Sequence, residues 1–318
     1  MRKPERKTQH ATERRSQETE RAQSVLIRLR EARPRRAMNG VPASPRILGN
    51  PMNFRALFHS VLLPALAGAG FLVAQNAPPT TMPWKDPSYD KDRPESHAIP
   101  RPDPGEGPNS WPLWMKHHEN RKRWVAEQDV DLLMVGDSIV FGWSRIGKPV
   151  WDEYFGKSSA VNIGSSGDRI CHMLWHFQNG GLDGMKKHNP KVVVVMMGTN
   201  NRGEPEKKGA DTAYGVLALL KEIHAKLPES KILLLAIFPR GDKPEDAGRL
   251  RNQEINAILQ TYADGKTVHW LDIGPSFLNA DGTLKRDLMP DALHPNLEGY
   301  RVWAEAMKPA LEKLMGGK

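Results

Sequence analysis

Beyond residue 110, short apolar runs alternate with longer amphipathic stretches. Short runs made mostly of apolar residues are typical of strands buried on both faces, and they occur at residues 130–135, 160–163, 192–197, 232–238 and 267–271. Apolar residues at helical spacing occupy residues 111–127, 169–178, 211–227, 246–262 and 297–314. Strands and helices in this alternation predict a parallel sheet covered by helices on both faces.

Four short polar segments follow one another in a fixed order. They are residues 136–138, 162–168, 198–201 and 291–294, and three of them come directly after predicted strands. In open α/β sheets the ligand site lies at the carboxyl ends of the strands. The segments supply a serine hydroxyl, a backbone amide at a glycine, a carboxamide, and a histidine with a carboxylate beside it. These groups suffice to attack an ester carbonyl and to hold the oxyanion that results.

At these segments the chain resembles the SGNH (GDSL-type) hydrolase superfamily, over about residues 111–316. The resemblance implies a flavodoxin-like three-layer α/β/α sandwich with a central five-stranded parallel sheet, and serine esterase activity. Residues 167–180, 198–201 and 238–241 are similar to those of the intracellular platelet-activating-factor acetylhydrolase catalytic subunits. Those subunits are cytosolic, whereas this chain has an export-like leader, so we carry over the fold and chemistry but not the substrate.

The resemblance implies a catalytic triad of Ser138 as nucleophile, His294 as base and Asp291 as the orienting carboxylate. A serine hydroxyl needs an adjacent base before it can attack, and an imidazole suits that task at neutral pH. A carboxylate three residues before a histidine can reach the Nδ1 side of the ring and fix its tautomer. Taken alone, Ser138 also fits a helix N-cap and Asp291 a turn residue, but the matching order of the segments favours catalysis.

The same resemblance implies an oxyanion hole formed by the Ser138 and Gly167 backbone amides and the Asn200 carboxamide. Glycine suits a turn where the backbone must approach substrate closely. The alternatives are an ordinary loop glycine, and a strand-end asparagine that satisfies loop backbone groups. We expect Trp143, five residues after the nucleophile, to form a wall of the substrate pocket.

No metal or other cofactor is expected. His172 and His176 lie four residues apart on a predicted helix, so both could face one ion, but no third ligand is apparent. The one cysteine, Cys171, excludes an intramolecular disulfide. It neighbours His172 along a helix, where adjacent side chains do not face each other, so packing is favoured over a catalytic thiol.

The net charge of +9 belongs almost entirely to the leader. Residues 1–50 hold 13 Lys/Arg and 5 Asp/Glu, and the remaining residues are close to neutral. A nucleic-acid-binding domain would carry its positive charge on a folded face, so no nucleic-acid partner is expected. Residues 1–51 have few large apolar groups, which predicts a disordered basic leader.

Residues 52–77 are predicted to form a secretory signal peptide or a membrane anchor, because a short basic stretch precedes an apolar run at 56–74. The true start of translation, at Met52 or Met38, is left open, and export is favoured over anchoring. Residues 78–110 are predicted to be a proline-rich linker. The hydrolase domain is expected to cover 111–318.

The leading functional hypothesis is a serine esterase that removes short acyl groups, above all acetyl, from a small-molecule or carbohydrate alcohol. The alternatives are a lipid esterase of the lysophospholipase or platelet-activating-factor acetylhydrolase kind, an acyltransferase with the same triad, and a non-catalytic binding protein. The choice of a carbohydrate ester rests on the export-like leader and on family analogy. Composition and motifs predict nothing about the oligomeric state.

Overall fold

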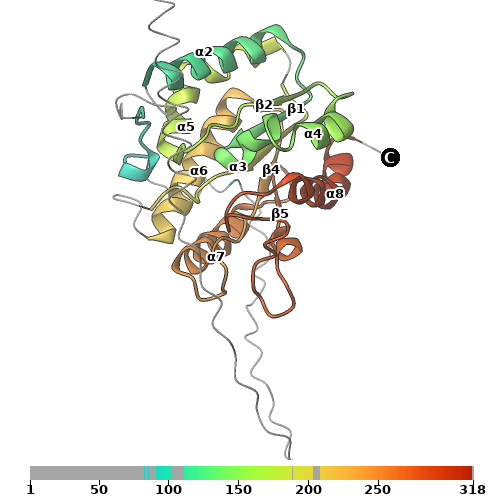
Figure 1. The fold of residues 1–318 in the computed structure, drawn as a ribbon. Coiled ribbons are helices and arrows are strands. Elements are labelled where there is room, and N and C mark those ends of the chain that lie inside the picture. Colours follow the sequence, from blue (N-terminus) through green and yellow to red (C-terminus); the bar gives the residue numbers. More distant parts are fainter. Residues whose placement is uncertain are drawn as a thin grey trace, which may run out of the picture. The chain divides into compact units, whose positions relative to one another are not determined.

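The computed structural model describes residues 82, 85, 91–101, 111–187, 189–202 and 208–316. Five strands form one parallel sheet in the order β2-β1-β3-β4-β5 (Figure 1). They are β1 (Leu132–Gly136), β2 (Ala160–Asn162), β3 (Val192–Met196), β4 (Lys231–Leu235) and β5 (Val268–Leu271). The predicted five-stranded α/β fold is confirmed, and the strand order places the topological switch point between β1 and β3.

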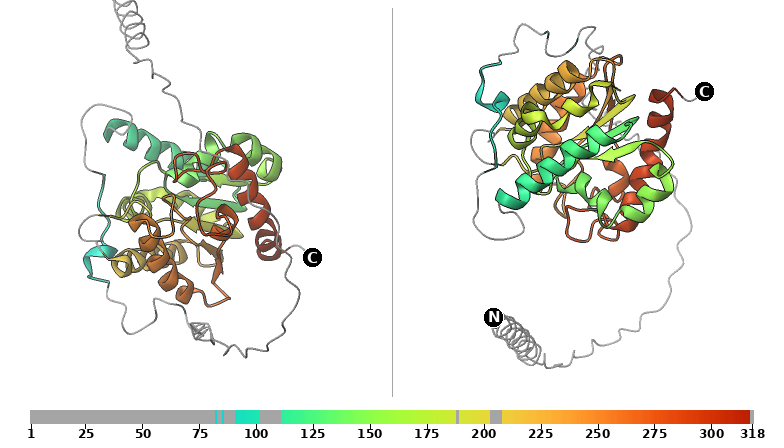
Figure 2. Two further views of the ribbon diagram at one scale, coloured as in Figure 1. Left: turned by 60° about the horizontal axis from the view of Figure 1, so that its bottom comes forward. Right: turned by 90° about the horizontal axis from the view of Figure 1, so that it is seen from above.

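Helices cover both faces of the sheet, as Figures 1 and 2 show. Four helices contribute to one apolar core: α2 (Trp111–Glu127), α5 (Ile170–His176), α6 (Gly209–Lys226) and α7 (Ala247–Leu259). α3 (Ser138–Phe141), α4 (Lys148–Phe155) and α8 (Leu297–Leu314) contribute to the other. The sheet therefore separates two cores, which defines a three-layer sandwich.

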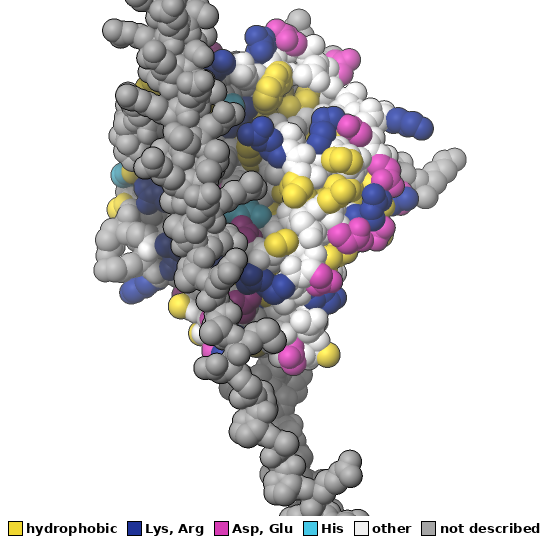
Figure 3. All heavy atoms as spheres, viewed as in Figure 1, with side chains coloured by type: hydrophobic (Ala, Val, Ile, Leu, Met, Phe, Trp, Pro, Cys, Tyr) yellow, Lys and Arg dark blue, Asp and Glu magenta, His cyan; other side chains and the backbone are white. Residues whose placement is uncertain are grey.

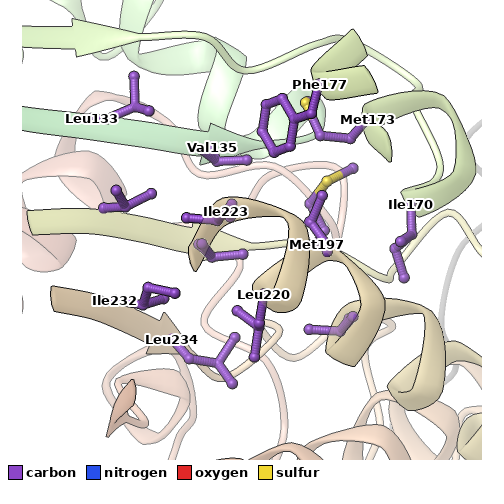
Figure 4. Close-up of a cluster of buried hydrophobic side chains, with 14 of the residues drawn as sticks. Leu133, Val135, Ile170, Met173, Phe177, Met197, Leu220, Ile223, Ile232 and Leu234 are labelled. Carbon is purple, nitrogen blue, oxygen red and sulfur yellow. The ribbon is translucent and has the colours of Figure 1, made fainter. Parts of the chain in front are cut away.

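Alternation along each strand assigns its side chains to the two cores. Leu133 and Val135 of β1 enter the core shown in Figure 4, together with Ile232 and Leu234 of β4. Their neighbours along the strands enter the opposite core. Because successive side chains of a strand point to opposite faces, a strand buried on both faces must be apolar throughout. This is why continuous apolar runs mark these strands in the sequence.

Part of the segment expected to be a linker packs against the domain. Residues 91–101 include the short 3₁₀ turn η2 (Pro94–Ser96), which lies beside α6 (Figures 1 and 2). Arg93 pairs with Asp211 of α6 at 3.3 Å, and its guanidinium lies 4.1 Å from the centre of the Tyr214 ring. At the other end, the Ile99 amide donates to the Cys171 carbonyl of α5 at 3.1 Å.

The leader and the apolar run at 52–77 lie outside the described residues, so disorder, signal and anchor stay predictions. Within the described ranges, no helix combines the length and apolar character needed to cross a membrane. On the face drawn in Figure 3, positive and negative side chains are interspersed. That mixture agrees with the near-neutral balance of the chain beyond residue 50.

Candidate active site

Ser138 stands at the carboxyl end of the central part of the sheet, where β1 turns sharply into α3. Asp137 caps α3 by accepting the Ile139 amide at 3.0 Å, so Ser138 becomes the first helical residue. The turn needs glycine at 136, since a Cβ there would lie 2.6 Å from the Met196 carbonyl of β3. Strand packing and capping together hold the serine at the edge of the sheet.

Ser138, His294 and Asp291 form a continuous chain of hydrogen bonds. Ser138 Oγ lies 2.9 Å from His294 Nε2, and His294 Nδ1 lies 2.7 Å from Asp291 Oδ2. The backbone amides of Leu293 and His294 donate to Asp291 Oδ1 at 3.0 and 2.7 Å. Partial burial would raise the pKa of Asp291, but these amides and the imidazole hold it below its usual value. A carboxylate fixed in this way orients the ring so that Nε2 can accept the serine proton.

The loop that carries Asp291 and His294 is held from a neighbouring loop. Ala292 adopts the left-handed conformation, with φ of 61°, and its carbonyl accepts the Gly241 amide at 2.9 Å. Arg286 donates to the Pro290 carbonyl at 2.5 Å and to Asp242 at 2.6 Å. A non-glycine residue at positive φ is strained, so these contacts maintain a conformation that the chain would not adopt alone.

Arg249 of α7 anchors the neighbouring loop in turn. Its side chain is 2% exposed and donates to the carbonyls of Arg240, Gly241 and Gly282 at 3.1, 2.8 and 3.0 Å. A planar guanidinium with five donors can hold several carbonyls at once. The position of the Asp291 loop therefore depends on a buried arginine that is remote from it in sequence.

The structure brings the other two predicted segments together beside Ser138. Gly167 has φ of 75°, and the Ser165 amide donates to the Gly136 carbonyl at 2.9 Å, which ties this loop to the β1 turn. Asn200 donates from Nδ2 to the Asp168 carbonyl at 3.0 Å. A carboxamide has two N–H groups, so one bond to the loop leaves a second donor for a ligand.

A buried carboxylate lies directly behind Gly167. Asp168 is fully buried; it accepts the Trp114 indole N–H at 2.9 Å, with His176 Nε2 at 3.2 Å and His172 Nδ1 at 3.7 Å. Burial alone would raise the pKa of Asp168, but the adjacent His172 and His176 rings hold it well below its usual value. The two histidines considered as metal ligands thus face this carboxylate. Among the described residues, no group of three His, Cys, Asp or Glu is placed to hold an ion.

Helix α2 closes this cluster with residues that the sequence analysis missed. His118 Nδ1 lies 2.8 Å from His176 Nδ1, and Arg121 donates to the Gly164 carbonyl at 3.3 Å. Burial lowers the pKa of His176 to about 4, with a further contribution from Arg121, so the ring is neutral at pH 7. The available signal was the spacing of Trp114, His118 and Arg121, which places three polar-tipped side chains on one helical face.

Trp143, expected to form a pocket wall, is instead a core residue. Its side chain is 0% exposed and packs against Trp303 and Tyr300 of α8, with ring centres 5.0 and 4.6 Å away. The expectation is wrong because α3 and the following turn η3 (Gly142–Ser144) place the Trp143 side chain in the core to which α3, α4 and α8 contribute. Cys171 is also buried, as its packing interpretation requires.

An open cavity of about 530 Å³ borders the Asp291 loop. Residues 291–293 form one side, and Arg202, Arg240 and Arg251 line the others. Arg240 is fixed by donating to the carbonyl and hydroxyl of Thr199, both at 3.0 Å. Burial and the nearby Arg202 lower the pKa of Arg240, which shows that the cations share one region. The three arginines therefore give this side of the cavity a positive charge.

A doubly wound sheet with a half-buried serine, an imidazole and a carboxylate in contact at its carboxyl edge is characteristic of ester-hydrolysing enzymes. The sequence model of the GDSL-like lipase/acylhydrolase family matches residues 134–302, and the chain belongs to that family. It is an ester-hydrolysing enzyme.

Relatives agree with this assignment, and a solved structure shares the fold. The human platelet-activating factor acetylhydrolase IB subunit alpha2 is 34% identical over 203 residues, which cover 64% of this chain and 83% of the relative. The human subunit alpha1 is 28% identical over 222 residues, covering 70% and 92%. A Bacteroides fragilis protein solved as a candidate acylhydrolase shares the fold, with a TM-score of 0.52 at 19% identity, over 65% of this chain and 99% of that one.

Proposed function

We propose that this protein is a serine esterase that removes short acyl groups, above all acetyl, from a polar alcohol. The observation that carries the proposal is the unbroken chain from Ser138 Oγ to His294 at 2.9 Å and from His294 to Asp291 at 2.7 Å. A hydroxyl, an imidazole and a carboxylate in this order form the machinery of acyl transfer through a covalent acyl-enzyme.

In the proposed mechanism, Ser138 Oγ forms a bond to the ester carbonyl carbon while its proton moves to His294 Nε2. The backbone amides of Ser138 and Gly167 and the second N–H of Asn200 donate to the oxyanion. When the tetrahedral intermediate collapses, the C–O bond breaks and Nε2 returns the proton to the leaving alcohol. Water then attacks the acyl-enzyme by the same route, which regenerates Ser138 and releases the acid.

The arginine-lined cavity supports a polar alcohol over a long alkyl chain. An alkyl chain laid against Arg202 and Arg240 would remove water from their guanidinium groups without supplying an acceptor, whereas sugar hydroxyls can accept N–H groups. An acetylated carbohydrate therefore stays the preferred substrate. The names of the 34% identical relatives support the acetyl group and keep a lipid ester as the second candidate.

The test is esterase activity of the full chain and of Ser138→Ala, measured with 4-nitrophenyl esters from acetyl to decanoyl and with acetylated xylo-oligosaccharides. Ser158→Ala is the matched control, because Ser158 is exposed and lies at the opposite end of the sheet. We expect Ser138→Ala to lose about 1,000-fold or more in kcat with its fold intact. A folded Ser138→Ala variant that keeps a tenth of the activity would refute the assignment.

A further inference from the structure

Two side-chain contacts join Arg101 to the loop that carries Gly167. Its Nη1 donates to the Ser166 carbonyl at 3.0 Å and lies 3.6 Å from Asp168 Oδ1. Its Nη2 lies 2.7 Å from the position that a Cβ on Gly167 would take. The guanidinium therefore contacts the residues on both sides of Gly167 and covers Gly167 itself.

The segment that presents Arg101 is fixed to the domain independently of this contact. Arg93 pairs with Asp211 at 3.3 Å, and the Ile99 amide donates to Cys171 at 3.1 Å. Arg101 is two residues beyond Ile99, so its backbone has little freedom once these anchors form. Its side chain is only 16% exposed, which means that it is packed against the loop rather than extended into solvent.

The contacted loop, residues 164–169, has no helix or strand to hold it, so side-chain contacts must do so. Gly167 has φ of 75°, which glycine adopts freely, and glycine is also the residue with the least restricted backbone. Asp168 is held from the interior by Trp114 at 2.9 Å and His176 at 3.2 Å. Arg101 contacts the same carboxylate and also the Ser166 carbonyl, which belongs to the peptide that carries the Gly167 N–H, so this peptide is held by the residues before and after Gly167.

We infer that Arg101 is a positioning residue for the oxyanion hole, supplied by a segment that precedes the family-matched residues 134–302. This inference rests on the proposed function of Gly167 as an oxyanion donor. Such a donor acts only if it is held in place before charge develops on the substrate, and small displacements of catalytic groups are costly in rate. Arg101 acts through the loop and need not touch the substrate.

The experiment compares Arg101→Gln and Arg101→Lys with Arg123→Gln in the full chain. Arg123 is 59% exposed on α2 and controls for the loss of one positive charge. We expect Arg101→Gln to lower kcat for 4-nitrophenyl acetate by about 10-fold, with KM changed by less than about 3-fold. Arg101→Lys should recover part of the loss, because an ammonium keeps the charge beside Asp168 but not the planar fork.

Hydrogen exchange provides a readout that is independent of turnover. In Arg101→Gln, the amides of residues 165–169 should exchange faster than in wild type, while those of β1 and β3 keep their protection. Unchanged kcat together with unchanged exchange would overturn the inference, as would a KM effect alone. The proposed function fails separately, if wild-type hydrolysis does not depend on Ser138.

Discussion

Replacing Asp137 with asparagine should make the folding stability of the protein less sensitive to a rise in pH. Asp137 is 1% exposed, and burial raises its pKa from 3.8 to about 6, although the Ile139 amide and His294 partly oppose the shift. The folded state therefore holds the Asp137 proton more tightly than the unfolded state does. Folding is favoured most while the group is neutral, and this contribution is lost as the pH rises through about 6.

The magnitude follows from the two pKa values. A rise of the pKa from 3.8 to about 6 corresponds to about 3 kcal/mol of folding stability. This contribution is lost completely at pH values well above the folded pKa. About 2 kcal/mol of that loss falls between about pH 4.5 and about pH 8. Asparagine keeps a side-chain oxygen for the Ile139 amide but carries no charge. Relative to wild type, Asp137→Asn should therefore gain about 2 kcal/mol across this interval.

Urea unfolding of wild type and Asp137→Asn at both pH values measures this gain. Any packing cost of the asparagine amide is the same at both pH values. The difference in unfolding free energy between the two proteins therefore changes with pH only through the charge of Asp137. The shifted pKa values of Asp168 and Asp291 are common to both proteins and cancel to first order. If the difference in unfolding free energy stays constant within about 0.5 kcal/mol between the two pH values, the pKa of Asp137 is not raised in the folded protein.

Three further outcomes are expected. Asp291→Asn should lower kcat by about 1,000-fold or more, because the amide no longer fixes the His294 tautomer; a rise in KM with kcat unchanged would contradict this role. Arg249→Met should lower the free energy of unfolding by about 3 kcal/mol by leaving three backbone carbonyls unpaired, and an unchanged urea midpoint would count against the anchor. Across 4-nitrophenyl esters, kcat/KM should be highest for acetyl or propionyl, whereas a steady rise to decanoyl would favour a lipid ester.

Sequence reasoning succeeded where short-range pattern determines structure. The strands are mostly apolar because both faces of the sheet are covered, and such apolar runs can be recognised in the sequence alone. The Asp291–His294 contact was predictable for a similar reason, since three residues separate them and the intervening turn closes locally. The meeting of Ser138 with His294 across 156 positions needed both the fold and the family resemblance.

The remaining features depend on contacts that spacing does not encode. α4 was not predicted, since its eight residues are too few for a clear helical period. Trp143 was placed in the pocket because it follows Ser138 closely, but a helical turn rotates it into the core. Arg101 was assigned to a linker because its neighbourhood is rich in proline and charge; only the position of Gly167 shows that this arginine has a partner.

The Asp291–His294 pair and the buried Asp168 behind Gly167 differ in their exposure to solvent. This difference determines whether a substitution lowers activity, stability or both. The side chains of Asp291 and His294 are 57% and 39% exposed, so their ion pair is screened by water and gives little stability. Its value lies in orientation, which Arg249 and Gly241 supply indirectly. Asp168, by contrast, is buried among donors, and removing one of them leaves an uncompensated polar group inside the protein. Changes to Asp291 or His294 themselves should therefore lower activity before stability, whereas changes behind Gly167 should lower both together.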